Sequence, residues 1–289
     1  MSRRILYARP RDLDEASQLV GALDTGTMLV AGGQELMPHI NYGRLAPSVL
    51  VDISGIGELA GISIDADEVS IGALTVHADL NSDRTVRRRL PLLAEAAAQV
   101  GGGRQVRNRG TIGGNIVAMH PLYDIVPTLL ALDAFVETCD ADGVRRIRLA
   151  ELIQTPGHGL GATAILSRVI VAPQSESGGW AYEKLKISDG AYGTANAAAL
   201  VTLDNSERIN AIKVVIGAVA ELPLDASNLV QASIGEAWNE RTAEFVERTC
   251  AEAVTEPLSD EQGEAAYRRA MAGVVARRAV AAAQRRARA

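Results

Sequence analysis

Two glycine pairs constrain this sequence more than any other feature: Gly32-Gly33 in "AGGQE" and Gly113-Gly114 in "TIGGN". The first pair follows the apolar run "TMLV", which predicts a strand that ends there. Glycine allows tight turns, and its bare backbone lets rows of N–H groups surround a buried anion. A turn alone would explain either pair. Together they favour one long anionic ligand held by both motifs, and a dinucleotide pyrophosphate is the natural candidate.

The composition narrows the class of protein. The chain has 289 residues, enough for a large core and for two or three subdomains. Its net charge of −6 argues against nucleic acid or an anionic membrane as a general partner. Only Cys139 and Cys250 are cysteines, which argues against a disulfide framework and favours a reducing, cytoplasmic location. An iron–sulfur cluster needs more thiolates than these two.

The sequence predicts neither a signal peptide nor a membrane span. The first residues, "MSRRILYARPRDLDEA", lack the apolar segment of a signal peptide. No apolar run approaches the roughly 20 residues that a membrane-spanning helix needs. We therefore expect a chain that works in aqueous solution.

Local patterns predict an α+β chain in three parts. Strand, helix and strand alternate over residues 1–54, which predicts a small, mostly parallel α/β unit. Residues 55–175 combine antiparallel hairpins around "DADE" and "DADG" with helices such as "LPLLAEAAAQV". The segment "APQSESGG", residues 172–179, has the composition of a boundary. Residues 176–289 hold three strand-like runs followed by helices.

The sequence does not support the motifs of other binding sites or of catalysis. Gly55, Gly57 and Ala60 match G-x-G-x-x-A, but an alternating strand pattern follows where a dinucleotide-binding helix would have to begin. No phosphate-binding loop of the G-x-x-x-x-G-K type occurs. The four histidines show no metal-ligand spacing, and no activated nucleophile is apparent. We expect no metal site and no catalytic residue in this chain.

Five segments occur in the order typical of a known family. They are "AGGQELMPHINYGRLAPSVLVDIS", "VSIGALTVHADL", "LPLLAEAAAQV", "RNRGTIGGNIVAMHPLYDIVPTLLALDA" and "WAYEKLKI". Over nearly its whole length the chain resembles the FAD-binding medium subunits of molybdenum hydroxylases, the flavoprotein subunits of the carbon monoxide and xanthine dehydrogenase family. The resemblance implies a two-subdomain FAD-binding domain of the PCMH/vanillyl-alcohol-oxidase type over residues 1–175, divided into 1–54 and 55–175. A C-terminal flavoprotein domain, residues 176–289, would add an antiparallel three-stranded sheet with a helical bundle.

The resemblance also implies which residues bind FAD. The two glycine motifs would wrap the pyrophosphate and the ribityl chain, and Asp124 would hydrogen-bond the flavin nucleotide. Tyr192 would lie on the isoalloxazine face, with a core tyrosine as the alternative. Lys184 is either a flavin neighbour or an exposed strand lysine. The implied cofactor-binding residues are Ala31, Gly32, Gly33, Gln34, Glu35, Thr111, Ile112, Gly113, Gly114, Asn115, Asp124, Leu166, Lys184 and Tyr192.

Glu35 departs from the family, which usually has Ser or Thr at this position. A carboxylate beside a pyrophosphate repels it unless the side chain points away, although the backbone N–H can still serve. Glu35 is the only hint of a different kind of protein, a flavin-free assembly module.

The resemblance implies partners as well. A large molybdopterin subunit would oxidise the substrate, and a small subunit would relay electrons through two [2Fe–2S] clusters. The FAD of this chain would collect them and pass them to NAD⁺, a quinone or O₂. A dimer of heterotrimers is expected. The alternative is a self-contained FAD oxidoreductase with its own substrate pocket.

The last helix predicted by the sequence carries seven arginines, from Arg268 to Arg288. They predict a solvated helix face or, alternatively, a docking surface for an acidic partner subunit.

Overall fold

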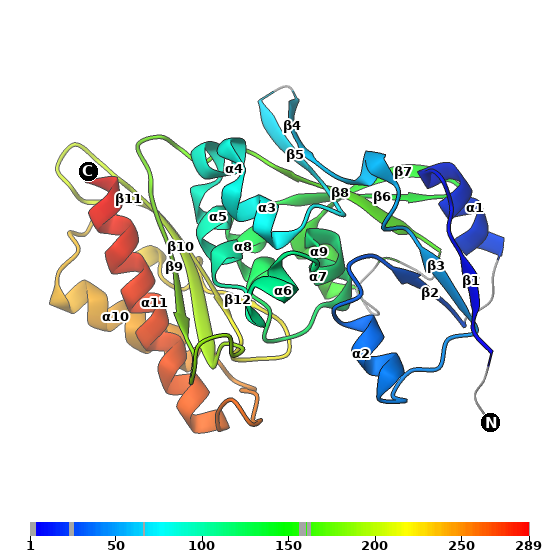
Figure 1. The fold of residues 1–289 in the computed structure, drawn as a ribbon. Helices are drawn as coiled ribbons and strands as arrows, with labels where there is room; N and C mark the ends of the chain where they lie inside the picture. The colour runs from blue at the N-terminus through cyan, green and yellow to red at the C-terminus, as the bar shows by residue number, and fades with distance from the viewer. Residues whose placement is uncertain (1–3, 23–25, 66, 156–159, 161–162, 289) are drawn as a thin grey trace. The chain divides into compact units, whose positions relative to one another are not determined.

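The computed structural model describes residues 4–22, 26–65, 67–155, 160 and 163–288 (Figure 1). The chain forms two compact units, each built from segments that are not continuous in sequence. Unit 1 comprises residues 1–80, 104–119 and 133–172, and unit 2 comprises residues 81–103, 120–132 and 173–289. The domain limits expected from the sequence, 1–175 and 176–289, stay a prediction.

Unit 1 begins with a three-stranded parallel sheet of order β1-β3-β2. Its elements are β1 (Leu6–Ala8), α1 (Leu13–Ala22), β2 (Thr27–Val30), α2 (Leu36–Asn41) and β3 (Val49–Asp52). Helix α1 begins at a capped end, since the Asp12 carboxylate accepts the Glu15 N–H at 2.9 Å. The Glu15 carboxylate in turn accepts the N–H of Arg11 at 2.9 Å, just before the helix. The strand–helix–strand pattern of residues 1–54 is confirmed.

The second sheet of unit 1 is antiparallel, with the order β4-β5-β8-β6-β7. The predicted hairpins are its β4/β5 and β6/β7 pairs. Its strands are β4 (Ile62–Asp65), β5 (Glu68–Gly72), β6 (Phe135–Asp140), β7 (Gly143–Arg148) and β8 (Ile165–Val171). The helical elements that accompany it are η1 (Gly57–Leu59), α3 (His77–Ser82), α6 (Gly103–Arg107), α7 (Ile112–Ala118) and α9 (Leu149–Gln154). Only a 3₁₀ turn follows Gly57, which agrees with the rejection of a dinucleotide fingerprint there.

Unit 2 is built on an antiparallel sheet of order β12-β11-β10-β9. Its strands are β9 (Gly179–Leu185), β10 (Ala195–Leu203), β11 (Ile209–Gly217) and β12 (Leu224–Asp225). Its helical elements are α4 (Arg84–Arg89), α5 (Pro91–Ala98), α8 (Ile125–Ala131), η3 (Gln231–Ser233), α10 (Glu240–Glu252) and α11 (Ala265–Ala287). The three expected strands are present, and the short strand β12 extends the sheet.

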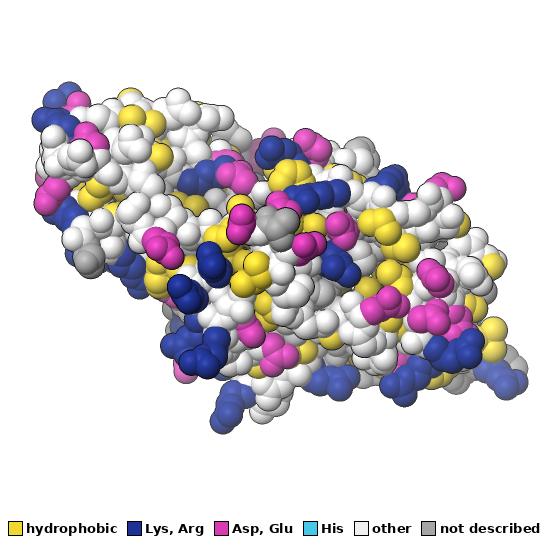
Figure 2. All heavy atoms as spheres, turned by 90° about the horizontal axis from the view of Figure 1, so that it is seen from above, with side chains coloured by type: hydrophobic (Ala, Val, Ile, Leu, Met, Phe, Trp, Pro, Cys, Tyr) yellow, Lys and Arg dark blue, Asp and Glu magenta, His cyan; other side chains and the backbone are white. Residues whose placement is uncertain are grey.

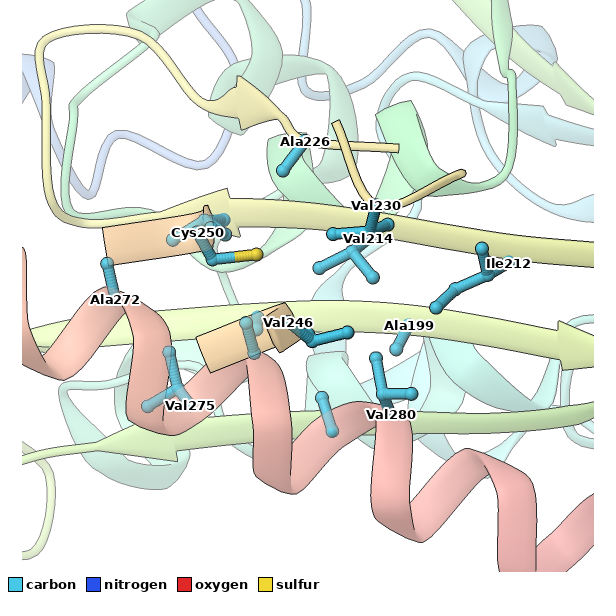
Figure 3. Packing of buried hydrophobic residues seen from close by; sticks show 14 of the residues in the cluster. Ala199, Ile212, Val214, Ala226, Val230, Val246, Cys250, Ala272, Val275 and Val280 are labelled. Atoms are coloured by element: carbon cyan, nitrogen blue, oxygen red, sulfur yellow. The ribbon is translucent and has the colours of Figure 1, made fainter. Parts of the chain in front are cut away.

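The two faces of this sheet carry different side chains because residues alternate along each strand. On β10, Ala195, Ala197 and Ala199 belong to the cluster that packs against α10 and α11. Figure 3 shows the helix side of this cluster, where Ala272, Val275 and Val280 of α11 point toward the strands. Small strand residues let α11 approach so closely that a Cβ at Gly179 would overlap the Ala283 carbonyl. The opposite face receives α8 and α5, which contact β10 and β9 respectively.

Arg268 lies fully buried at the start of α11. Its guanidinium donates to the Thr194 carbonyl at 3.0 Å and to the Gly263 carbonyl at 3.2 Å. It also donates to the Ala218 carbonyl and to the Asp260 carboxylate. One side chain thus joins the residue before β10, the residue after β11 and the segment that precedes α11.

The other arginines at the C-terminal end agree with a solvated helix face, because Arg269, Arg278, Arg285, Arg286 and Arg288 are exposed, and the alternative of a docking surface stays a prediction. Five of the seven bind groups within unit 2. Besides Arg268, these are Arg269 with the carbonyls of Val254 and Thr255, Arg277 with Glu240 and Glu247, Arg286 with Glu95, and Arg288 with Glu207. These contacts join the exposed face of α11 to neighbouring segments of unit 2.

On the face drawn in Figure 2, basic and acidic side chains are interspersed and neither sign forms a continuous patch. None of the described helices is long and apolar enough to cross a membrane.

We predict that Arg268→Ala lowers the free energy of unfolding by about 3–5 kcal/mol, because it leaves buried carbonyls without a donor and opens a void. Urea unfolding followed by circular dichroism measures the change. Arg278→Ala, at an exposed position of the same helix, should change the free energy by less than about 0.5 kcal/mol. Equal effects of the two substitutions would show that the buried contacts of Arg268 do not contribute more to stability than an exposed arginine does.

Candidate functional site

The two glycine motifs meet inside unit 1. A Cβ on Gly32 would overlap the Arg109 carbonyl, so the backbone of one motif lies directly against the approach to the other. The second motif is held from the other side by the segment before α3. There the His77 N–H donates to the Gly110 carbonyl at 3.0 Å, and the Ile112 N–H donates to the Thr75 carbonyl at 2.9 Å. The sequence prediction that the motifs act together is consistent with this contact.

The AGGQE loop, residues 31–35, joins β2 to α2 (Figure 1). Gly33 has φ +70°, a left-handed conformation that favours glycine. Within the part of the chain that the structure describes, the backbone N–H groups of Gly32, Gly33 and Gln34 have no acceptor. Successive free N–H groups around a left-handed residue form a concave site for an anion. Ala31 packs its methyl group against the core of the parallel sheet.

The TIGGN motif forms the start of α7 and differs from the expectation. Its N–H groups are not a second row of free donors, because residues 112–115 all donate within unit 1. The Gly113 N–H binds the Ala73 carbonyl at 2.9 Å, and the Gly114 N–H binds Oγ1 of Thr111 at 3.0 Å. Gly113 is glycine because a Cβ would come within 2.8 Å of the Ala73 carbonyl oxygen. What this motif leaves for a ligand is Oδ1 of Asn115, which is buried and has no partner among the described residues.

The Glu35 side chain turns along α2. Its Oε1 lies 2.9 Å from Nε2 of His39, one helical turn further on. The carboxylate therefore has a partner in its own segment.

His77 is a buried residue of unit 1 that is not among the predicted cofactor-binding residues. Its ring lies against Gly110, where a Cβ would come within 3.1 Å of it, and its Nδ1 has no partner in the described part of the chain. Burial, together with the nearby charge of Arg107, lowers the pKa of His77 to about 4. The ring is therefore neutral when the unit is folded at neutral pH.

Leu166, on β8, is only 5% exposed. It pairs with Thr138 of β6 and takes part in the antiparallel sheet of unit 1. The flavin contact expected for Leu166 stays a prediction.

In unit 2, Asp124 is the centre of a buried ionisable cluster. Tyr182 donates its hydroxyl to Oδ1 at 2.5 Å, and Nζ of Lys184 donates to Oδ2 at 2.8 Å. The same Nζ donates to the Gln99 carbonyl at 3.0 Å. The Lys184 side chain is fully buried, so the exposed strand lysine considered from the sequence is wrong.

Burial decides the titration of this cluster. It raises the pKa of Asp124, although the Lys184 charge opposes the change. Burial and the adjacent carboxylate raise the pKa of Tyr182, which keeps the phenol protonated as a donor. The sequence prediction missed Tyr182. The sequence did contain a signal for it: Tyr182 and Lys184 are two positions apart on β9, so their side chains lie on the same face of the strand.

Tyr192 belongs to a separate aromatic group of unit 2. Its ring stacks on His120 with the centroids 5.3 Å apart and lies 6.3 Å from the ring of Tyr123. Tyr192 is 40% exposed, so the alternative of a core tyrosine does not hold. An exposed aromatic ring supported from behind suits a stacking role, although its place on a flavin stays a prediction.

No cluster of three or more His, Cys, Asp or Glu side chains that could hold a metal ion occurs among the described residues. The two cysteines are both buried and unbridged. Burial raises the pKa of Cys250 to about 12, which makes this thiol unreactive.

Comparison with known proteins identifies the class. Residues 2–174 match the family model of the FAD binding domain in molybdopterin dehydrogenase. Residues 180–283 match the C-terminal domain of the CO dehydrogenase flavoprotein. The two matches define a flavoprotein of the molybdopterin dehydrogenases.

Individual relatives agree over the full length. The carbon monoxide dehydrogenase medium chain of Hydrogenophaga pseudoflava is 35% identical, and the alignment covers 97% of each chain. A chain in the structure of carbon monoxide dehydrogenase from that organism, lacking the Mo-pyranopterin moiety, matches with a TM-score of 0.94 and 34% identity over 99% of each chain. One in quinoline 2-oxidoreductase from Pseudomonas putida 86 matches with a TM-score of 0.90 and 28% identity over 99% of each chain. The chain belongs to the family of FAD-binding medium subunits of molybdenum hydroxylases, which are oxidoreductase components.

The residues of unit 1 fit the FAD that this family binds. The three acceptor-free N–H groups of the AGGQE loop suit a diphosphate, and the unpaired Oδ1 of Asn115 suits a hydroxyl or amide donor. In unit 2 both carboxylate oxygens of Asp124 already accept hydrogen bonds from the chain itself. Its direct contact with the flavin nucleotide therefore stays a prediction.

We predict that His77 makes unit 1 sensitive to acid. A histidine with a lowered native pKa contributes stability that is complete above its unfolded pKa of 6.5 and is lost as the pH falls toward 4. Over this window the loss amounts to about 3 kcal/mol. His77→Phe should remove this part of the pH dependence, measured as the difference between the two proteins in urea unfolding. Parallel pH profiles would contradict the assignment.

We predict that Asp124→Asn destabilises unit 2 by about 3–5 kcal/mol, because the Lys184 ammonium stays buried without a counter-charge. The double variant Asp124→Asn/Lys184→Met should recover most of the loss, since the introduced asparagine still accepts the Tyr182 hydroxyl. Thermal unfolding of the set measures both steps. If the double variant were as unstable as the sum of its single changes, Asp124 and Lys184 would not act as a pair.

Proposed function

We propose that the chain is the FAD-binding electron-transfer subunit of a heterotrimeric molybdenum hydroxylase. The observation that carries the proposal is the row of acceptor-free N–H groups from Gly32 to Gln34, within the part of the chain that matches an FAD-binding domain. FAD, when bound, supplies the two-electron chemistry. The chain supplies binding, orientation and electrostatics.

The AGGQE loop would hold the pyrophosphate through backbone N–H groups, which donate without carrying a full charge. Asn115 would meet a polar group of the ribityl chain with its buried side-chain oxygen. In unit 2, Tyr192 would cover one isoalloxazine face and exclude water from it. Lys184 would act near the flavin through its buried charge, and Asp124 would set the position of that charge.

The family supports the proposed partners. We infer a large subunit with molybdopterin, a small subunit with two [2Fe–2S] clusters and a dimer of such heterotrimers. The chain would receive electrons from the clusters and pass them to NAD⁺, a quinone or O₂. Relatives that share the fold serve enzymes of different substrates, carbon monoxide and quinoline among them, so substrate choice would lie in another subunit. The cytoplasmic location stays a prediction from the cysteine content.

We predict that the full chain, co-expressed with the genes beside it, purifies as a complex with molybdenum, iron and non-covalent FAD. Gly33→Val should lose the FAD while the complex still assembles, because a β-branched side chain strains the left-handed position and crowds the free N–H groups. The visible absorption of oxidised flavin measures retention.

The matched control is Gly43→Val. Gly43 has φ +69° and open space around it, so the backbone strain is the same but the AGGQE loop is untouched. It should retain FAD. Loss of FAD in both variants would mean that strain, rather than the anion site, is responsible. A single chain that turns over substrate and acceptor alone would support the self-contained oxidoreductase instead. A wild-type complex without flavin would support the assembly module.

A further inference from the structure

The loop between β9 and β10, which carries Tyr192, lies against the segment that follows α5 in unit 2. The Gly102 N–H of that segment donates to the Gly190 carbonyl at 2.8 Å. A Cβ on Gly101 would lie 3.0 Å from the carbonyl oxygen of Gly190 and 3.1 Å from that of Ala191. The two backbones are therefore in direct contact immediately before Tyr192.

Gly101 is restricted by space rather than by backbone conformation. Its φ lies outside the left-handed region, whereas Gly102 has φ +79° and Gly190 has φ +80°. The two Cβ contacts at Gly101 would be shorter than an ordinary van der Waals contact of about 3.5–4.0 Å. A methyl group there would push both carbonyls away by a few tenths of an ångström. Because the Gly102 N–H holds the Gly190 oxygen, the displacement would pass to Ala191.

The far side of the loop is held at Thr194, two residues after Tyr192. The Thr194 N–H donates to the Leu185 carbonyl at 2.8 Å, which closes the loop across β9 and β10. The Thr194 carbonyl accepts a hydrogen bond from the buried guanidinium of Arg268 at 3.0 Å. A displacement that begins at Ala191 therefore has to be absorbed before Thr194, and Tyr192 lies between the two.

We propose that Gly101 is a positioning residue for the flavin face: its missing side chain lets Gly190 and Ala191 lie against it, which sets the Tyr192 ring on the isoalloxazine. The proposal rests on the proposed function, in which Tyr192 covers one face of the flavin. A stacked aromatic ring contributes about two- to tenfold in affinity. A gap of a few tenths of an ångström forfeits part of that contact, because dispersion attraction falls steeply with distance.

A double-mutant cycle tests the proposal on the full chain in its complex. FAD is removed and titrated back into wild type, Gly101→Ala, Tyr192→Ala and Gly101→Ala/Tyr192→Ala, and the dissociation constant and the emission of the bound flavin are measured. A stacked tyrosine quenches flavin fluorescence by donating an electron, so the emission reports the position of the ring.

We expect Gly101→Ala to weaken FAD binding about two- to fivefold and to raise the emission of the bound flavin. Tyr192→Ala should change both quantities by at least as much. The double variant should match Tyr192→Ala, because Gly101 acts through the ring.

The matched control is Gly178→Ala. Gly178 directly precedes β9, at the end of the strand away from Tyr192, and a Cβ there would make ordinary contacts of 3.4 Å or more. This variant adds the same methyl group and should leave both the affinity and the emission unchanged. Equal losses in Gly178→Ala and Gly101→Ala would overturn the proposal, since the effect would not depend on the contact with the loop.

Additive losses in the double variant would also overturn it, because Gly101 would then act independently of Tyr192. If the wild-type complex binds no FAD, the proposed function fails and this inference fails with it. If Tyr192→Ala changes the flavin signals while Gly101→Ala matches wild type, this inference alone is refuted.

Discussion

The contact between Gly32 and the Arg109 carbonyl fixes the geometry of unit 1. Two backbone segments that are far apart in sequence lie so close that no side chain fits between them. One of them then enters α2 and the other enters α7, so both helices start from a common point. Backbone groups that pack without side chains have few ways to move, because the packing offers no rotamers to change. An anion site made of N–H groups depends on this rigidity, since its donors cannot reorient as a lysine can.

This contact explains why glycine is required at these positions. From the sequence, a turn alone would explain either pair, and the two pairs together favoured a shared anionic ligand. Gly32 and Gly113 are instead bare because carbonyls of the chain itself occupy the space where a Cβ would be, those of Arg109 and Ala73. Gly33 is glycine because its φ is positive. What the two motifs leave without a partner among the described residues is the set of N–H groups in the first motif and Oδ1 of Asn115 in the second. A glycine in a sequence indicates that a side chain is unfavourable at that position, but the sequence alone does not show whether the chain itself or a ligand is the reason.

Elements set by local pattern were predictable, and those set by distant contacts were not. The parallel strands of residues 1–54 and the hairpins around "DADE" and "DADG" follow from alternation and turn residues, and they are present. The packing of α5 and α8 against the C-terminal sheet has no local signal, because it joins segments that are far apart in the sequence. The resemblance singled out Asp124 and Lys184 as flavin residues. Their ion pair could not be read from the sequence, since nothing in a pattern places α8 next to β9. The partners of the arginines at the C-terminal helix, such as Glu95 and Glu207, were not predictable for the same reason, since they lie in distant segments.

The buried ion pair of Asp124 and Lys184 carries a large desolvation penalty. Transferring both charges out of water costs free energy that their mutual attraction only partly offsets, and a well-packed apolar pair of similar volume is often as stable. The cost is reduced here because Tyr182 and the Gln99 carbonyl satisfy the remaining hydrogen bonds. An apolar pair would tolerate sliding between the layers, whereas this cluster has one geometry in which every group is satisfied. Its donors and acceptors come from β9, from the start of α8 and from the end of α5, so it ties both helices to β9 at defined points. The face of the sheet lined by alanines and valines is held by close packing against α11. Close packing thus holds α11, whereas a buried hydrogen-bonded cluster adds directional contacts for α5 and α8.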